Sequence, residues 1–139
     1  MKVAIVYATT TGNTEQLANA AAEGAKSAGR EVSLTTADKG DISEALGADL
    51  ILLGSPAMGA EQLEESMEDF FSGIEGQLGG KKVGLFGSYD WGDGQWLRDW
   101  TDRLNNAGAV SAAEALMVHL TPEEADVEQC KAWAASAIK

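Results

Sequence analysis

Strand-like apolar runs alternate with longer helical patterns along the whole chain. The runs occupy residues 2–8, 31–37, 49–55, 81–88 and 113–120. Apolar runs of this length, with little polar alternation in most of them, indicate strands that are covered on both faces. The stretches between them are long enough for crossover helices, so the pattern predicts an α/β fold with a parallel sheet and helices on both faces.

The segment that follows the first run is rich in hydroxyl groups. Residues 9–14 read TTTGNT, and the following residues form a helical pattern that Gly29 ends. The first N–H groups of a helix lack backbone partners, and the helix dipole favours negative charge there. Hydroxyls add donors, and Gly12 lets the backbone approach a ligand closely. We therefore expect a phosphate site made of Thr9, Thr10, Thr11, Gly12, Asn13 and Thr14.

Two alternatives to this phosphate site were considered. A threonine or asparagine often begins a helix as a simple cap, but one cap needs one such residue, and this loop has five. The loop also has no lysine or arginine, unlike the loop of a nucleotide triphosphatase. Backbone dipoles and hydroxyls would hold the phosphate.

The third and fourth runs also end in glycine-containing loops. These read GSPAMGAEQLEES and GSYDWGDGQWLRDW, starting at Gly54 and Gly87. Each carries apolar or aromatic residues between its glycines, which suits a flat ligand held between loops. In open parallel sheets, ligands bind beyond the carboxyl ends of the strands. The three loops therefore predict one shared site.

Composition narrows the classes of protein. The 139 residues, 45% of them hydrophobic, fit a single domain spanning 1–139. No signal peptide or apolar run of about 18 residues is present, so we expect a cytoplasmic protein. One cysteine, Cys130, and one histidine, His119, predict neither a disulfide nor a metal site. The net charge of −12 argues against nucleic acid or anionic membranes as partners and suits basic proteins.

The three loops together resemble those of the flavodoxins, specifically the short-chain clostridial type. Thr9, Thr11, Gly12 and Thr14 match the family's T-x-T-G-x-T pattern, and the segments PAMG and GSYDWGDG match its second and third flavin loops. The resemblance covers essentially the whole chain. It implies a three-layer sandwich around a five-stranded parallel sheet of order 2-1-3-4-5, for which flavodoxin is itself the standard example.

The resemblance also implies a non-covalently bound FMN and a role for each loop. The threonine loop would hold the phosphate, Met58 and Trp91 would cover the two ring faces, and Glu61 would accept a hydrogen bond from the ring N3–H. Trp96 and Trp100 are expected to be packing residues. The flavin-loop residues carried over are Pro56, Ala57, Met58, Gly59, Glu61, Ser88, Tyr89, Asp90, Trp91 and Gly92. Asp90 stands where close relatives have glycine, and Ala60 where they have a polar or acidic residue.

The function implied is that of a low-potential one-electron carrier rather than an enzyme. The protein would shuttle electrons between reductases and ferredoxin-linked oxidoreductases, through the semiquinone and hydroquinone states of FMN. Residues 61–76 hold six acids and no base, so basic partners would dock on this acidic face, and we expect a monomer.

Two other functions stay open at this point. An FMN-dependent quinone reductase would be expected to add a nicotinamide site or oligomer contacts, which the sequence does not identify. An aspartate-phosphorylated receiver domain of similar fold needs acids at the ends of the first and third strands. This chain has Ala8-Thr9 and Ser55-Pro56 there.

Overall fold

The computed structural model describes residues 2–9, 12–58, 62–89, 94–119 and 122–137. Four parallel strands form its centre: β1 (Lys2–Tyr7), β2 (Glu31–Thr36), β3 (Leu50–Met58) and β5 (Lys82–Tyr89). They lie side by side in the order β2-β1-β3-β5. Beyond β5 lie two short parallel strands, β6 (Val110–Ser111) and β7 (Leu116–His119). The predicted strand order and parallel direction are confirmed.

The outer edge of the sheet differs from the prediction in detail. β6 pairs with the start of β5 and β7 pairs with its end, so two short segments share the position of the fifth strand. Residues 112–115 separate them, and Ser111 Oγ donates a hydrogen bond to the Ala113 carbonyl at the break. A further two-residue strand, β4 (Gln62–Leu63), pairs antiparallel with the end of β3 and was not predicted.

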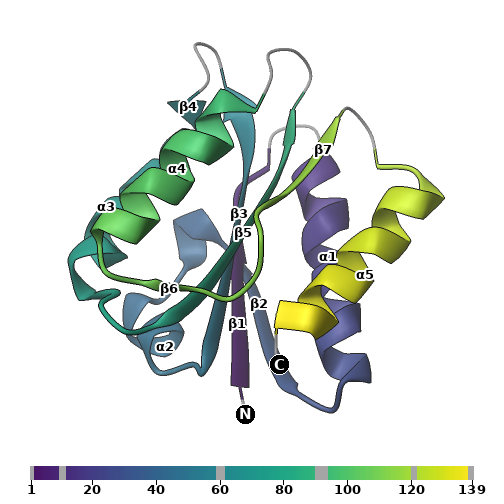
Figure 1. Ribbon diagram of the computed structural model, residues 1–139, viewed down its shortest axis with the longest axis horizontal. Helices are drawn as coiled ribbons and strands as arrows, with labels where there is room; N and C mark the ends of the chain where they lie inside the picture. The colour runs from purple at the N-terminus through teal and green to yellow at the C-terminus, as the bar shows by residue number, and fades with distance from the viewer. Residues whose placement is uncertain (1, 10–11, 59–61, 90–93, 120–121, 138–139) are drawn as a thin grey trace.

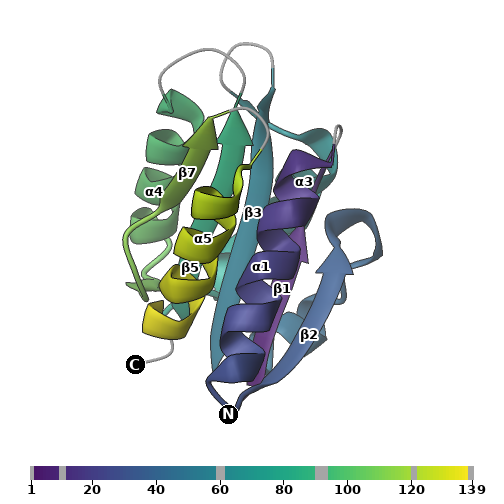
Figure 2. The same ribbon diagram turned by 90° about the vertical axis from the view of Figure 1, so that its right-hand side faces the viewer.

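Helices cover both faces of the sheet, which makes three layers (Figure 1). Helices α1 (Asn13–Ser27) and α5 (Glu124–Ala137) pack against each other on one face. The other face carries α2 (Ile42–Leu46), α3 (Glu65–Ile74) and α4 (Gln95–Asn106), with short 3-10 turns at Ala37–Lys39 and Glu75–Gln77. The view turned by 90° shows α1 and α5 side by side in front of the strands (Figure 2). The predicted three-layer arrangement is therefore confirmed.

Each central strand contributes to two apolar cores because successive side chains point to opposite faces. In β1, Ala4 and Val6 join the core under α3 and α4, whereas Val3 and Ile5 join the core under α1 and α5. The same alternation continues in β3 and β5. This two-sided burial explains why these strands read as apolar runs rather than as polar–apolar alternation.

Helix α1 is bounded by two glycines in the left-handed region. Gly12 precedes it with φ +92°, and Gly29 follows it with φ +81°. Near Gly29 the N–H of Arg30 donates to the Ala25 carbonyl, which ends the helix with a glycine-type C-terminal turn. The predicted helix end at Gly29 is confirmed. The helix start places Asn13 and Thr14 in the first turn, at the carboxyl end of β1.

Candidate functional site: the carboxyl edge of the sheet

The three predicted ligand loops begin at one edge of the molecule. β1 ends at Tyr7, β3 at Met58 and β5 at Tyr89, and because these strands are parallel and adjacent, their carboxyl ends meet. Figure 1 shows the segments that follow them together at the top of the sheet. β3 and β5 are longer than β1, and their pairing extends to Pro56 and Ser88. The predicted site residues from the three loops therefore lie at one edge.

The start of helix α1 is arranged as an open anion site. Gly12 occupies the cap position, and no side chain caps the helix there. The Gly12 N–H donates to Thr9 Oγ1 at 3.0 Å, which folds the loop toward the helix. A Cβ added to Gly12 would meet nothing within 4 Å, so there is open space in front of the first turn. A threonine acting as a simple helix cap is not what the described residues show.

Thr14 and Ser88 form a buried hydroxyl pair between two of the loops. Their Oγ atoms are 2.7 Å apart, with Thr14 fully buried and Ser88 exposed by only 3%. Thr14 belongs to the first turn of α1, whereas Ser88 lies near the end of β5. The pair therefore ties the helix that starts the predicted phosphate site to the strand that leads into the third loop.

The second loop is fixed at both ends by Ser55. Its hydroxyl is buried, donates to the Pro56 carbonyl at 3.0 Å and accepts from the Glu64 N–H at 3.0 Å. Ala57 pairs with Leu63 in the β3–β4 hairpin, so the chain turns back between Met58 and β4. Met58 itself is 39% exposed, unusual for so large an apolar side chain, and it is available to contact a ligand.

Aromatic side chains support the start of the third loop. The ring of Tyr89 lies 4.8 Å from the ring of His119, and 5.6 Å from that of Trp96. Trp96 and Trp100 are each only 1% exposed, which confirms that both are packing residues. His119 lies at the end of β7, as expected from the sequence.

Seven predicted site residues lie outside the described part of the chain. They are Thr10, Thr11, Gly59, Glu61, Asp90, Trp91 and Gly92. The remaining predicted residues, Thr9, Gly12, Asn13, Thr14, Pro56, Ala57, Met58, Ser88 and Tyr89, all lie at the carboxyl edge.

The acidic segment that follows the second loop is less uniform than its sequence suggests. Arg103 of α4 reaches across to α3 and contacts both oxygens of Glu68 at 2.8 and 2.9 Å. It also contacts Glu75 at 3.3 Å and lies over the ring of Phe71. Hydrogen bonds from Arg103 lower the pKa of Glu68, although burial opposes this. Glu64 caps α3 by accepting the Ser66 N–H at 2.9 Å.

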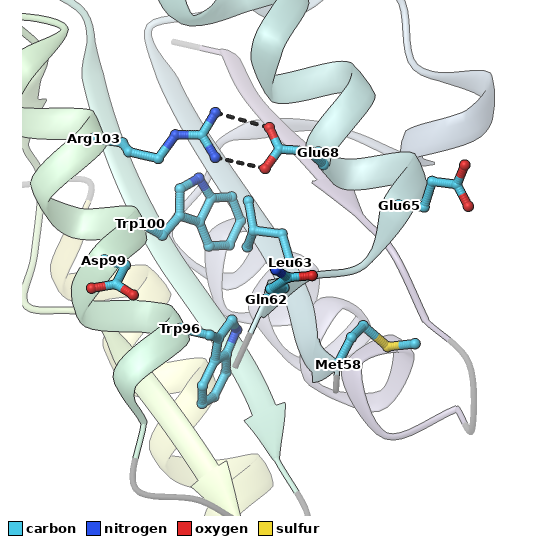
Figure 3. Close-up of a pocket in the computed structure, with 9 residues that line it drawn as sticks. All are labelled: Met58, Gln62, Leu63, Glu65, Glu68, Trp96, Asp99, Trp100 and Arg103. Carbon is cyan, nitrogen blue, oxygen red and sulfur yellow. Dashed lines mark hydrogen bonds and ion pairs between the residues drawn. The ribbon is translucent and has the colours of Figure 1, made fainter. Parts of the chain in front are cut away.

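A groove of about 540 Å³ runs between α3 and α4, beginning beside Met58. We call it the α3–α4 groove; Figure 3 shows its lining side chains. Trp96, Trp100 and Leu63 form its apolar lining, and the Arg103–Glu68 pair lies toward one end. Its remaining polar lining residues are Gln62, Glu65 and Asp99.

Sequence reasoning missed two of these features. The Thr14–Ser88 pair joins residues 74 positions apart, and the Arg103–Glu68 contact joins residues 35 positions apart. A base in the first-listed partner helix gives no sequence signal for either, because both depend on how distant elements pack. The amphipathic pattern of α4 could only have indicated that Arg103 lies on a partly exposed face.

Comparisons with known proteins identify the class of this doubly wound protein as flavin-binding. The family model described as Flavodoxin matches residues 5–133. A flavodoxin from Clostridium beijerinckii is 45% identical over 88% of this chain and 89% of its own length. One from Megasphaera elsdenii is 42% identical, over 99% and 98%. The solution structure of the two-electron reduced Megasphaera elsdenii flavodoxin has a TM-score of 0.88 and covers 97% of both chains.

The chain belongs to the flavodoxin family. Flavodoxins are FMN-bound electron carriers rather than enzymes, and that is the function of this chain. The quinone reductase and receiver-domain alternatives are not favoured by these relatives. No helix in the described part of the chain is long and apolar enough to cross a membrane.

Proposed function

We propose that the three loops at the carboxyl edge bind FMN, with its phosphate at the start of α1 and its ring between the second and third loops. The observation that carries this proposal is the uncapped start of α1. Gly12 offers no side-chain acceptor, has φ +92° and faces open space. The first-turn N–H groups suit a phosphate better than any neutral group.

Each described loop residue has a separate task in this proposal. Thr9 holds the Gly12 N–H and so shapes the loop, whereas Thr14 is held by Ser88. Met58 offers an exposed thioether to one ring face, and sulfur packs well against aromatic rings. Thr10, Thr11, Gly59, Glu61, Asp90, Trp91 and Gly92 remain proposed contacts on the sequence resemblance alone. When bound, FMN accepts and donates electrons one at a time.

Comparison of FMN with riboflavin tests the phosphate assignment. We expect FMN to bind much more tightly, as measured by quenching of flavin fluorescence during titration of the FMN-free protein. Thr9→Val removes the acceptor for the Gly12 N–H, so it should weaken FMN binding by about three- to tenfold, the value of one hydrogen bond. Thr36→Val, at the end of the neighbouring strand β2, is the control. Equal affinities for FMN and riboflavin would rule out the phosphate site.

The charge of the chain suits a low-potential carrier with basic partners. A net charge of −12 disfavours every added electron, which is our basis for proposing low potentials. We also propose that the protein is a cytoplasmic monomer that exchanges electrons with reductases and ferredoxin-linked oxidoreductases. Glu65 and Asp69 are exposed on α3 close to the second loop, and they form the acidic face that steers these partners.

This assignment differs from a count of all acids in residues 61–76. Glu68 and Glu75 are paired with Arg103, and Glu64 caps α3, so changing them would alter the structure as well as the charge. Glu65 and Asp69 are therefore the better test positions.

A matched pair of double variants tests the acidic face. Glu65→Gln with Asp69→Asn and Glu23→Gln with Glu31→Gln each remove two charges, but Glu23 and Glu31 lie away from the carboxyl edge. The assay is the rate of electron transfer from the reduced protein to cytochrome c, a basic haem protein. We expect the first variant to be slower than the second at low ionic strength, and the difference to vanish in high salt. Equal rates at low ionic strength would refute the acidic face.

A further inference from the structure

We propose that the α3–α4 groove binds a lysine or arginine side chain from the docking surface of a redox partner. The proposal rests on the electron-carrier function above and adds a short-range anchor to the long-range steering by the acidic face. Three observations carry it: the lining of the groove, its charge and its position beside Met58.

The groove is lined by surfaces that suit the stem of a long cationic side chain. Trp96 and Trp100 present indole surface along α4, and Leu63 of β4 faces them across the groove (Figure 3). The aliphatic stem of a lysine or arginine packs on such apolar surface while its charged head stays in water. A cation close to an indole face gains further attraction.

The charge of the groove favours a cation over an anion. Arg103 is the only base in its lining, and its guanidinium is already engaged by Glu68 and Glu75. Two further carboxylates remain, Glu65 on α3 and Asp99 on α4, and both residues are exposed. Asp99 accepts one hydrogen bond from Gln95 Nε2 at 2.7 Å, and a carboxylate has capacity for more.

The position of the groove gives this contact a consequence for electron transfer. One end lies at Met58, the residue proposed to cover a ring face, and Figure 3 shows Met58 at the opposite end of the groove from Arg103. A partner anchored here has its surface beside the second loop. The groove would therefore fix the partner's orientation after the acidic face has attracted it.

Asp99→Lys and Asp102→Lys provide a matched test. Both residues are exposed on α4 three positions apart, and each substitution changes the net charge by the same amount. Asp99 lines the α3–α4 groove, whereas Asp102 lines a different pocket beside β6 and β7. The loaded protein is reduced, and its second-order rate of electron transfer to cytochrome c is measured from low to high ionic strength. The reduction potential and melting temperature of each variant are measured alongside.

At high ionic strength, where steering is screened, we expect Asp102→Lys to match the unmodified protein and Asp99→Lys to be about tenfold slower, as for the loss of one well-placed interface contact. Asp99→Asn should give an intermediate rate. Potentials and melting temperatures should be unchanged in both lysine variants.

Two outcomes would overturn the groove proposal. Equal rates for Asp99→Lys and Asp102→Lys at every ionic strength would show that the groove takes no part, even where salt dependence still supports the acidic face. Concentration-dependent dimerisation of the unmodified protein that Asp99→Lys abolishes would show that a second copy fills the groove. A rate that does not depend on salt in any of the proteins would refute the acidic face instead.

Discussion

The Thr14–Ser88 pair allows a prediction whose size follows from burial. Ser88→Ala removes one hydroxyl and leaves the other, on the fully buried Thr14, without its partner. A buried polar group that loses its hydrogen bond costs about 1–3 kcal/mol. Thr14→Val, which keeps the side-chain shape, leaves the Ser88 hydroxyl in the same position and should cost a similar amount.

The double variant distinguishes this pair from two independent hydroxyls. With both hydroxyls removed, no buried group is left unpaired, so we expect a loss of only about 0.5–1.5 kcal/mol, close to the net value of one hydrogen bond. The single variants should each lower the melting temperature by about 4–12 °C, taking roughly 4 °C per kcal/mol for a chain of this size. The double variant should melt no lower than the less stable single variant.

Urea unfolding of the FMN-free protein is the suitable assay, because ligand binding does not then contribute to the measured stability. A double-mutant cycle gives the coupling energy directly. If the free-energy losses of Thr14→Val and Ser88→Ala simply add in the double variant, the two hydroxyls do not bond to each other and the reasoning fails.

Three further predictions concern other parts of the molecule. Gly24→Ala should reduce stability in urea by about 1–3 kcal/mol, despite the helix preference for alanine, because a Cβ there would overlap the Lys131 carbonyl oxygen; equal or higher stability would contradict this close contact. Arg103 lowers the pKa of Glu68 in the folded state, so the pair stabilises the fold above the ordinary glutamate pKa and less as the pH falls below it. Glu68→Gln should lose less stability than the unmodified protein between neutral pH and pH near 3, by less than about 1 kcal/mol because the pair is partly exposed. Burial raises the pKa of Cys130 to about 12, so a thiol reagent should react at neutral pH only as fast as the protein opens, and rapid labelling of the folded protein would refute this.

The sequence predicted the central strands because each is buried on both faces. Residues 49–55 and 81–88 read as strands without regard to their neighbours, and β3 and β5 lie there. The outer edge was harder, since β6 has only two residues and both are exposed. Strand β4 gave no pattern either, because it depends on the turn that follows Met58.

The candidate site was predictable to the level of its loops but not of their contacts. Glycines and threonines at strand ends indicate a ligand, and the described members of the predicted set do lie at one edge. Which hydroxyl bonds to which is decided by packing: Thr14 points to Ser88, and Thr9 holds Gly12. The acidic segment shows the same limit, because the base that pairs with Glu68 comes from α4.

The described contacts anchor the loops from their ends. Thr9 holds the first loop where it enters α1, Ser55 joins both ends of the second, and Ser88 holds the strand that leads into the third. Contacts placed outside the loop centres leave the residues between them free to differ without loss of the frame. Ala60 and Asp90, the two departures from close relatives, both fall between such anchors in the sequence. An electron carrier needs this separation, because its potential is adjusted by the groups around the ring, while its binding site must keep one shape through each transfer.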